Sequence, residues 1–149
     1  LNDKEIRKII ELVFFSYRDF TAGPDQILEK LNFGRAHHRV IYFVGKKDKI
    51  TIKELLGVLK ITKQSLSRVL NQLVKEGFIV VSTGLDKRTK NLSLTSSGLS
   101  LENELSTIQM QKIKKVINNF NQEDIDGFKK ILYEMIEIDN KKTFQHLNE

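Results

Sequence analysis

Residues 63–75 carry the side chains best suited to hydrogen-bond a polar partner. Gln64, Ser67, Arg68, Asn71 and Lys75 recur at spacings of three and four, so on a helix they share one face. Amides and hydroxyls can read base edges, and lysine and arginine can pair with phosphates. The pattern indicates a nucleic-acid surface, but taken alone it is equally compatible with an ordinary solvated helix face.

A second basic segment, "GLDKRTKNLSLTSSG", spans residues 84–98. Lys87, Arg88 and Lys90 lie in its turn-rich first half, and the alternation of Leu92–Thr95 predicts a return strand. Such a loop can lie on a DNA backbone with its arginine in the minor groove. In isolation it is equally compatible with a solubilising hairpin tip.

The distribution of charge favours the nucleic-acid interpretation of both segments. The 149-residue chain has a formal net charge of +6. Residues 46–95 hold 11 Lys/Arg and four Asp/Glu, a net charge of +7, and the rest of the chain has a net charge of −1. The excess positive charge is therefore confined to one third of the sequence, which is typical of a nucleic-acid-binding face.

Two short helices and a hairpin must position these side chains. Thr51, with Glu54 three residues later, predicts a capping box that starts a short helix through Leu59, and Lys60-Ile61 form a tight connection. Thr62 predicts the cap of the next helix, whose inward face is Leu66, Val69, Leu70, Leu73 and Val74, and Gly77 closes that helix. Strands over 78–82 and 92–95 complete a hairpin. This order predicts a helix-turn-helix with a wing.

The flanking segments predict longer helices. The first covers residues 3–20 and is broken by "TAGP" at 21–24. The second helical region runs from Pro24 to about Val44, with a kink expected near Asn32–Gly34, before a charged loop at 46–50. In the second helix the residues expected to be mostly buried are Ala36, Val40, Tyr42, Phe43 and Val44. A long helix starts at Ser96 or Ser97, a last helix covers 122–139, and a polar, frayed tail follows Asn140.

The wing and the helix-turn-helix resemble those of MarR-type transcriptional regulators. Asp86, Arg88, Leu94, Thr95 and Gly98 match the wing pattern D-x-R followed by L-T-x-x-G. The stretch "LLGVLKITKQSLSRVLNQLVKEGFI" is similar to that family's helix-turn-helix. Two departures are Thr89, where a second basic residue often stands, and the lack of a basic residue near the end of "FIVVS". Both imply fewer wing contacts.

The resemblance implies a mainly α fold with a small β-hairpin (α+β). Residues 1–45 would form scaffold and dimerisation helices, 46–95 the DNA-binding domain, and 96–149 the C-terminal dimerisation helices. The apolar stripes of residues 6–17, 101–120 and 125–136 fit this division, because one small lobe cannot cover them. Their simpler alternative is an intramolecular core.

The implied function is a transcriptional regulator, a repressor by family habit, that binds pseudo-palindromic double-stranded DNA as a homodimer. The alternatives are a winged-helix module for protein assembly and a non-specific architectural DNA binder. Asp86 is expected to order the wing by pairing with an arginine. The expected DNA contacts are Thr62, Lys63, Gln64, Ser65, Ser67, Arg68, Asn71, Lys87, Arg88 and Lys90.

A small aromatic or lipophilic effector is a further implied partner, with its pocket near Arg39, Tyr42 and Phe43. The chain has no cysteine, so it has no thiol for redox sensing. Adjacent His37 and His38 point about 100° apart on a helix and form a poor metal pair, so no metal is expected. One of these two histidines is expected to be partly buried.

Several other functions are not expected. The sequence shows no nucleophile with its base, no paired carboxylates and no phosphate-binding loop, so neither an enzyme nor a cofactor is expected. No apolar run approaches a membrane span, and the N-terminal segment does not read as a signal peptide. These features and the lack of cysteine fit a cytoplasmic location.

Overall fold

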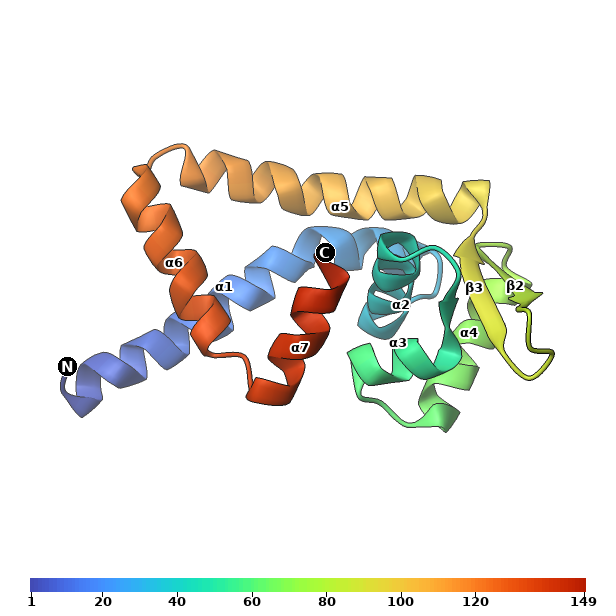
Figure 1. Cartoon of the computed structure of the whole chain (residues 1–149). Coiled ribbons are helices and arrows are strands. Elements are labelled where there is room, and N and C mark those ends of the chain that lie inside the picture. The colour runs from blue at the N-terminus through green and yellow to red at the C-terminus, as the bar shows by residue number, and fades with distance from the viewer.

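The computed structural model describes residues 1–149 and contains seven helices and three strands. In Figure 1 a lobe built from α2, α3, α4 and the sheet lies at one end, and α1 and α5 extend away from it. The elements are α1 (Asp3–Lys30), α2 (Arg35–Lys46), β1 (Ile50–Thr51), α3 (Ile52–Leu59), α4 (Lys63–Lys75), β2 (Ile79–Thr83), β3 (Lys90–Leu94), α5 (Ser96–Ile117), α6 (Gln122–Glu134) and α7 (Ile138–Leu147).

The hydrophobic core lies in the lobe and at its junction with α1 and α5. Leu55 of α3, Leu73 of α4, and Ile79 and Leu92 of the sheet are almost fully buried. Leu28 from α1 and Leu101 and Leu105 from α5 join the same cluster. The mainly α fold with a small β element is therefore confirmed.

The predicted break at "TAGP" is wrong, because α1 continues through Pro24 to Lys30. Proline removes one backbone donor from a helix, but here its ring is fully buried against the core. Gly23 lets α5 approach closely, since a Cβ there would lie 2.8 Å from Ile108 Cγ2. The helix ends instead at Leu31 and Asn32, where Asn32 adopts the left-handed region with φ 58°.

The sheet has one strand more than the sequence predicts. Its order is β1-β3-β2, with both pairs antiparallel. Within residues 46–50, expected to be a charged loop, Ile50 is buried and pairs with Leu92. The other pair, β2 with β3, is the predicted hairpin, with Val81 opposite Leu92.

The two helices of the helix-turn-helix begin where their caps predict. The Thr51 side chain accepts from the Glu54 backbone N–H at 3.1 Å. The second half of the capping box is not formed, because the Glu54 carboxylate binds the Thr51 hydroxyl and Lys47 instead. Lys60, in the left-handed region with φ 51°, makes the turn between α3 and α4.

The C-terminal segment is helical beyond the point where the sequence predicts fraying. The expected helix over 122–139 ends at Glu134, and α7 then forms from Ile138 to Leu147. This last helix packs against α3, and Lys46 Nζ donates to Asn148 Oδ1 at 3.3 Å. A polar tail is ordered here by tertiary contacts that its own sequence does not reveal.

Large apolar side chains remain exposed on α1, α5 and α6, and α6 has no buried residue. The three helices form the elongated part of the molecule in Figure 1. No helix combines the length and apolar character that a membrane crossing requires. The exposed side chains on these three helices are Ile6, Ile9, Ile10, Leu12, Val13, Phe14, Phe15, Tyr17, Leu99, Met110, Ile113, Val116, Phe128, Ile131 and Leu132.

Candidate nucleic-acid interface

Helix α4 has one buried face and one exposed polar face. Leu66, Val69, Leu70 and Leu73 pack into the core as predicted. Val74 does not, because it lies on the side of α4 that faces solvent and is 38% exposed. The face of α4 that points away from the core exposes the predicted contacts Lys63, Gln64, Ser67, Arg68 and Asn71. We call these five residues the α4 polar face.

The start of α4 is fixed by two hydroxyl side chains that the sequence places among the DNA contacts. Thr62 Oγ1 accepts from the Ser65 backbone N–H at 3.1 Å and lies 2.9 Å from Ser65 Oγ. Thr62 is exposed and Ser65 is half-buried. Thr62 therefore caps the helix, and Ser65, whose backbone N–H it caps, offers less of its surface to a partner than its neighbours do.

The wing loop, residues 84–89, is closed by its own hydrogen bonds. Gly84 N donates to Thr89 O, and Thr89 N donates to Asp86 O, both at 2.9 Å. The Asp86 carboxylate accepts from the Arg88 backbone N–H at 3.0 Å. Asp86 thus orders the loop through the backbone, and the expected pairing with an arginine side chain is absent.

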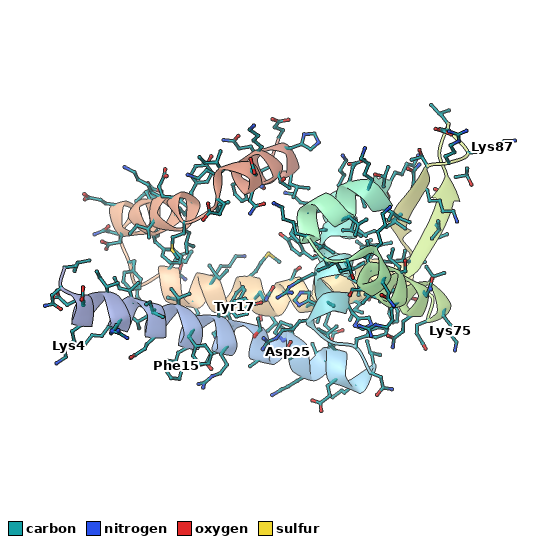
Figure 2. All side chains as sticks on the ribbon, turned by 90° about the horizontal axis from the view of Figure 1, so that it is seen from below. Lys4, Phe15, Tyr17, Asp25, Lys75 and Lys87 are labelled. Carbon is teal, nitrogen blue, oxygen red and sulfur yellow. The ribbon has the colours of Figure 1, made fainter.

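Ordering of the loop leaves the basic side chains of the wing free. Lys87, Arg88 and Lys90 are exposed, and Figure 2 shows Lys87 projecting from the tip of the wing away from the body of the molecule. None of these three cations, nor Lys63 or Arg68 of α4, takes part in any of the six ion pairs of the chain. Their charge is therefore available to an anionic partner.

The residues Leu94-Thr95-x-x-Gly98 lock the wing to α5. Thr95 Oγ1 donates to Gly77 O at 2.6 Å and accepts from Gly98 N at 3.1 Å, so it caps α5 and ties it to the end of α4. The Thr95 backbone N–H donates to Phe78 O at 3.1 Å. A Cβ on Gly98 would lie 2.0 Å from that same Phe78 oxygen. Position 98 therefore requires glycine for close packing.

The three residues predicted to line an effector pocket make contacts with one another and with α1. Arg39 Nη2 donates to the Tyr17 hydroxyl at 3.1 Å, and Tyr42 packs edge-on against Phe43 at 5.1 Å between ring centroids. Tyr42 is 40% exposed and Ala36 is exposed, so the expectation that both are buried is wrong. Ile41, on the inner side of α2, is buried in their place.

One hollow of the molecule lies elsewhere, between α3, β1 and α7. It has a volume of about 420 Å³ and is lined by residues that include Lys47, Glu54, Gly57, Thr143 and His146. Lys47 lies against the Glu54 carboxylate, and this hydrogen bond lowers the pKa of Glu54. Arg39, Tyr42 and Phe43 do not border this hollow.

Both histidines of "RAHHR" are half-buried, where the sequence predicts burial of one. Burial lowers the pKa of His38 below 6.5, against the opposing effect of Asp25 and Glu102. His37 contacts Gln72 of α4, with 2.7 Å between His37 Nε2 and Gln72 Oε1. The sequence gives no signal for this contact, because the two residues are 35 positions apart.

These elements define a winged helix-turn-helix protein with long flanking helices. The sequence model of the MarR family matches residues 31–89. The chain is 39% identical over 150 residues to the HTH-type transcriptional regulator PetP of Rhodobacter capsulatus, an alignment that covers 100% of this chain and 90% of that protein. The chain therefore belongs to the MarR family of transcriptional regulators.

More distant relatives and solved structures agree with this fold. The HTH-type transcriptional repressor YetL of Bacillus subtilis is 24% identical over 132 residues, which cover 84% of this chain and 79% of that protein. FabT of Streptococcus pneumoniae, solved in complex with DNA, superposes with a TM-score of 0.78 at 19% identity, covering 87% and 94% of the two chains. The MepR–DNA complex of S. aureus gives a TM-score of 0.63 at 20% identity and covers 91% and 96%.

Proposed function

We propose that the chain binds pseudo-palindromic double-stranded DNA as a homodimer and represses transcription from it. The observation that carries the proposal is the pairing of the exposed α4 polar face with a wing whose cations have no acidic partner. Helix α4 would enter the major groove, and Gln64, Arg68 and Asn71 would face base edges. Lys87, Arg88 and Lys90 would lie along the backbone, with Arg88 at the minor groove.

The remaining predicted contacts supply the backbone part of this interface. Lys63 and Ser67 are exposed beside the base-reading residues. Thr62 and Ser65 stand at the helix N-terminus, where backbone N–H groups and the helix dipole favour a phosphate. Phosphate contacts of this kind set the register of the protein on DNA but do not read sequence.

The dimer is supported by the apolar faces of α1, α5 and α6. Many large apolar side chains left exposed on a few helices are typical of an interaction site. Ile10 and Phe128 are 64% and 62% exposed in the single chain, and a second copy would cover such residues. A two-fold dimer then places two copies of α4 about 34 Å apart, one turn of B-DNA.

We also propose that an effector releases the DNA, with Arg39, Tyr42 and Phe43 at its site. The support is chemical: a cation beside two aromatic rings suits a small aromatic or lipophilic anion. The Arg39–Tyr17 hydrogen bond, 3.1 Å long, would have to open to admit it.

Fluorescence anisotropy tests the function directly. The full chain is titrated into fragments of its own genome and into scrambled duplexes of equal length, at several salt concentrations. A specific regulator gives at least a ~10³-fold preference for one fragment and a salt slope of several phosphates. Equal affinity for every duplex would indicate an architectural binder, and no binding at low salt would leave a protein-assembly module.

A further inference from the structure

The turn between α3 and α4 holds a lysine in a backbone conformation that lysine rarely adopts. Lys60 has φ 51° and ψ 43°, in the left-handed region. A Cβ in that region crowds the backbone carbonyl oxygen, so glycine or asparagine is the usual residue. The chain does place a glycine where the backbone leaves α4, since Gly77 has φ 83°. Lys60 therefore makes the fold less stable than glycine would at the same position.

The turn cannot relax, because the residues on both sides of Lys60 are fixed. Leu59 and Ile61 pack against the hydrophobic core. The Lys60 backbone N–H donates to Leu56 O at 2.8 Å and ends α3, and Thr62 caps α4 two residues later. The backbone of the turn therefore sets the direction in which the exposed Lys60 side chain leaves it.

Lys60 is an unpaired cation beside the α4 polar face. It takes part in none of the six ion pairs of the chain. Two residues separate it from Lys63, the first residue of α4. A recognition helix enters the major groove with its N-terminal residues, so the turn before it meets the phosphates at the edge of that groove. In the proposed complex the Lys60 ammonium group would lie at this edge.

We propose that Lys60 contacts a DNA phosphate and positions the start of α4 in the major groove. The chain keeps lysine in the turn for this contact, at a cost in stability. The proposal rests on the DNA-binding function proposed above and adds a contact that was not expected from the sequence. Strain alone does not single out Lys60, because Lys49 also has a positive φ, of 60°. The position of Lys60 beside Lys63 distinguishes the two lysines.

Lys49 is the matched control for Lys60. It is exposed, forms no ion pair and has nearly the same φ. It precedes β1, in which Ile50 pairs with Leu92 and the next residue pairs one step nearer the wing. Lys49 therefore lies at the end of the sheet away from the wing. Its replacement by glycine removes the same charge and the same strain as replacement of Lys60, without removing the proposed contact.

Two measurements on each variant separate stability from binding. Urea unfolding is followed on the free chain, and fluorescence anisotropy is measured with the preferred genomic fragment and a scrambled duplex at several salt concentrations. Lys60→Gly should unfold at a higher urea concentration than wild type, because glycine adopts the left-handed region without strain. It should bind both duplexes about three- to tenfold more weakly at low salt, with a salt slope reduced by about one phosphate per chain.

Two further variants make the comparison specific. Lys60→Arg keeps both the cation and the strain, so it should match wild type in stability, affinity and salt slope. Lys49→Gly should gain stability as Lys60→Gly does, but it should bind DNA within about twofold of wild type with an unchanged salt slope.

The outcomes distinguish this contact from DNA binding as such. If wild type binds DNA and Lys60→Gly binds with the same affinity and salt slope, the contact is overturned and DNA binding stands. An equal weakening in Lys49→Gly also overturns the contact, because the loss would then come from net charge. If Lys60→Gly is no more stable than wild type, the stability cost of Lys60 is overturned. If wild type binds no duplex, the DNA-binding function and the contact both fail.

Discussion

At the scale of single residues, the two groups of basic and polar side chains have different expected roles. The α4 polar face presents side chains fixed on a helix, whereas Lys87 and Arg88 project from a loop ordered by backbone hydrogen bonds. A rigid helix suits the reading of base edges, and a projecting cation suits contact with phosphates or the minor groove. Substitutions in the two groups should therefore have different effects on DNA binding.

Arg68→Ala or Gln64→Ala should cost about 1–3 kcal/mol of binding free energy and relax discrimination at particular base pairs. Arg88→Ala should instead weaken all duplexes similarly and reduce the salt slope by about one. Anisotropy on a panel of single-base-pair variants, repeated at several salt concentrations, measures both effects.

Lys4→Ala is the control for these measurements, because Lys4 lies at the far end of α1 from the wing (Figure 2). It should leave affinity and discrimination unchanged. Unchanged affinity and salt slope in Arg88→Ala would mean that the wing does not contact DNA.

His38 should make stability depend on pH. Its pKa in the folded chain is lowered from 6.5, chiefly by burial, so the unfolded chain binds the proton more readily. The contribution of neutral His38 to the free energy of unfolding should thus be complete above pH 6.5 and should decrease as the pH drops below that value. Urea unfolding of wild type and His38→Gln between pH 8 and 5 tests this, and the difference between them should shrink on acidification. A constant difference would contradict it.

At the scale of elements, the sequence predicts what is encoded locally. Thr51 and Thr62 cap α3 and α4 because a threonine hydroxyl can reach the N–H three residues later without help from elsewhere. The break expected at "TAGP" does not occur, since α1 continues through Pro24, whose ring is fully buried despite the lost backbone donor. The strand β1 has two residues and no pattern of its own, and α7 is ordered by contact with α3.

In the candidate interface too, the features encoded locally are predictable from the sequence and those set by tertiary contacts are not. The exposed face of α4 follows from helical spacing, and the exposed wing cations follow from turn-rich composition. The partner of Asp86 could not be predicted, because a carboxylate accepts hydrogen bonds from a backbone N–H as well as from a guanidinium. The His37–Gln72 contact depends on how α2 crosses α4, which no local pattern contains.

Gly98→Ala should destabilise the chain by about 1–3 kcal/mol or more, because its methyl group would overlap the Phe78 carbonyl oxygen. Gly57→Ala in α3 is the matched control. A Cβ there meets nothing within 4 Å, and alanine in a helix interior is favoured over glycine by about 1 kcal/mol. Urea unfolding should therefore move in opposite directions for the two variants, and equal stability of Gly98→Ala and wild type would refute the packing role of Gly98.

At the scale of the whole molecule, a single chain leaves its elongated half uncovered. The core lies in the lobe of α2, α3, α4 and the sheet, whereas α6 contributes no buried residue. Isolated exposed apolar residues are normal in soluble proteins, but here large ones recur along α1, α5 and α6. These exposed residues support the proposed homodimer.

Ile10→Glu and Phe128→Glu should each convert a dimer into monomers, because a charge would be buried without a partner. Sedimentation equilibrium should give twice the chain mass of 17.3 kDa for wild type and the single mass for the variants. Val80→Glu, at a 50% exposed site on β2 outside the three helices, should remain dimeric. A monomeric wild-type chain would overturn the assembly.

The hydrogen bonds of Thr95 and the close packing of Gly98 make α5 a lever that carries the wing at its N-terminal end. Its 22 residues correspond to a rod about 33 Å long, and its N-terminal end is tied to Gly77 and Phe78 by direct hydrogen bonds. A tilt of about 5° at the far end would displace the wing by about 3 Å over that length. In the proposed dimer, such a shift would move the two recognition helices relative to the turns of a duplex, so small repacking among α1, α5 and α6 would be amplified at the DNA.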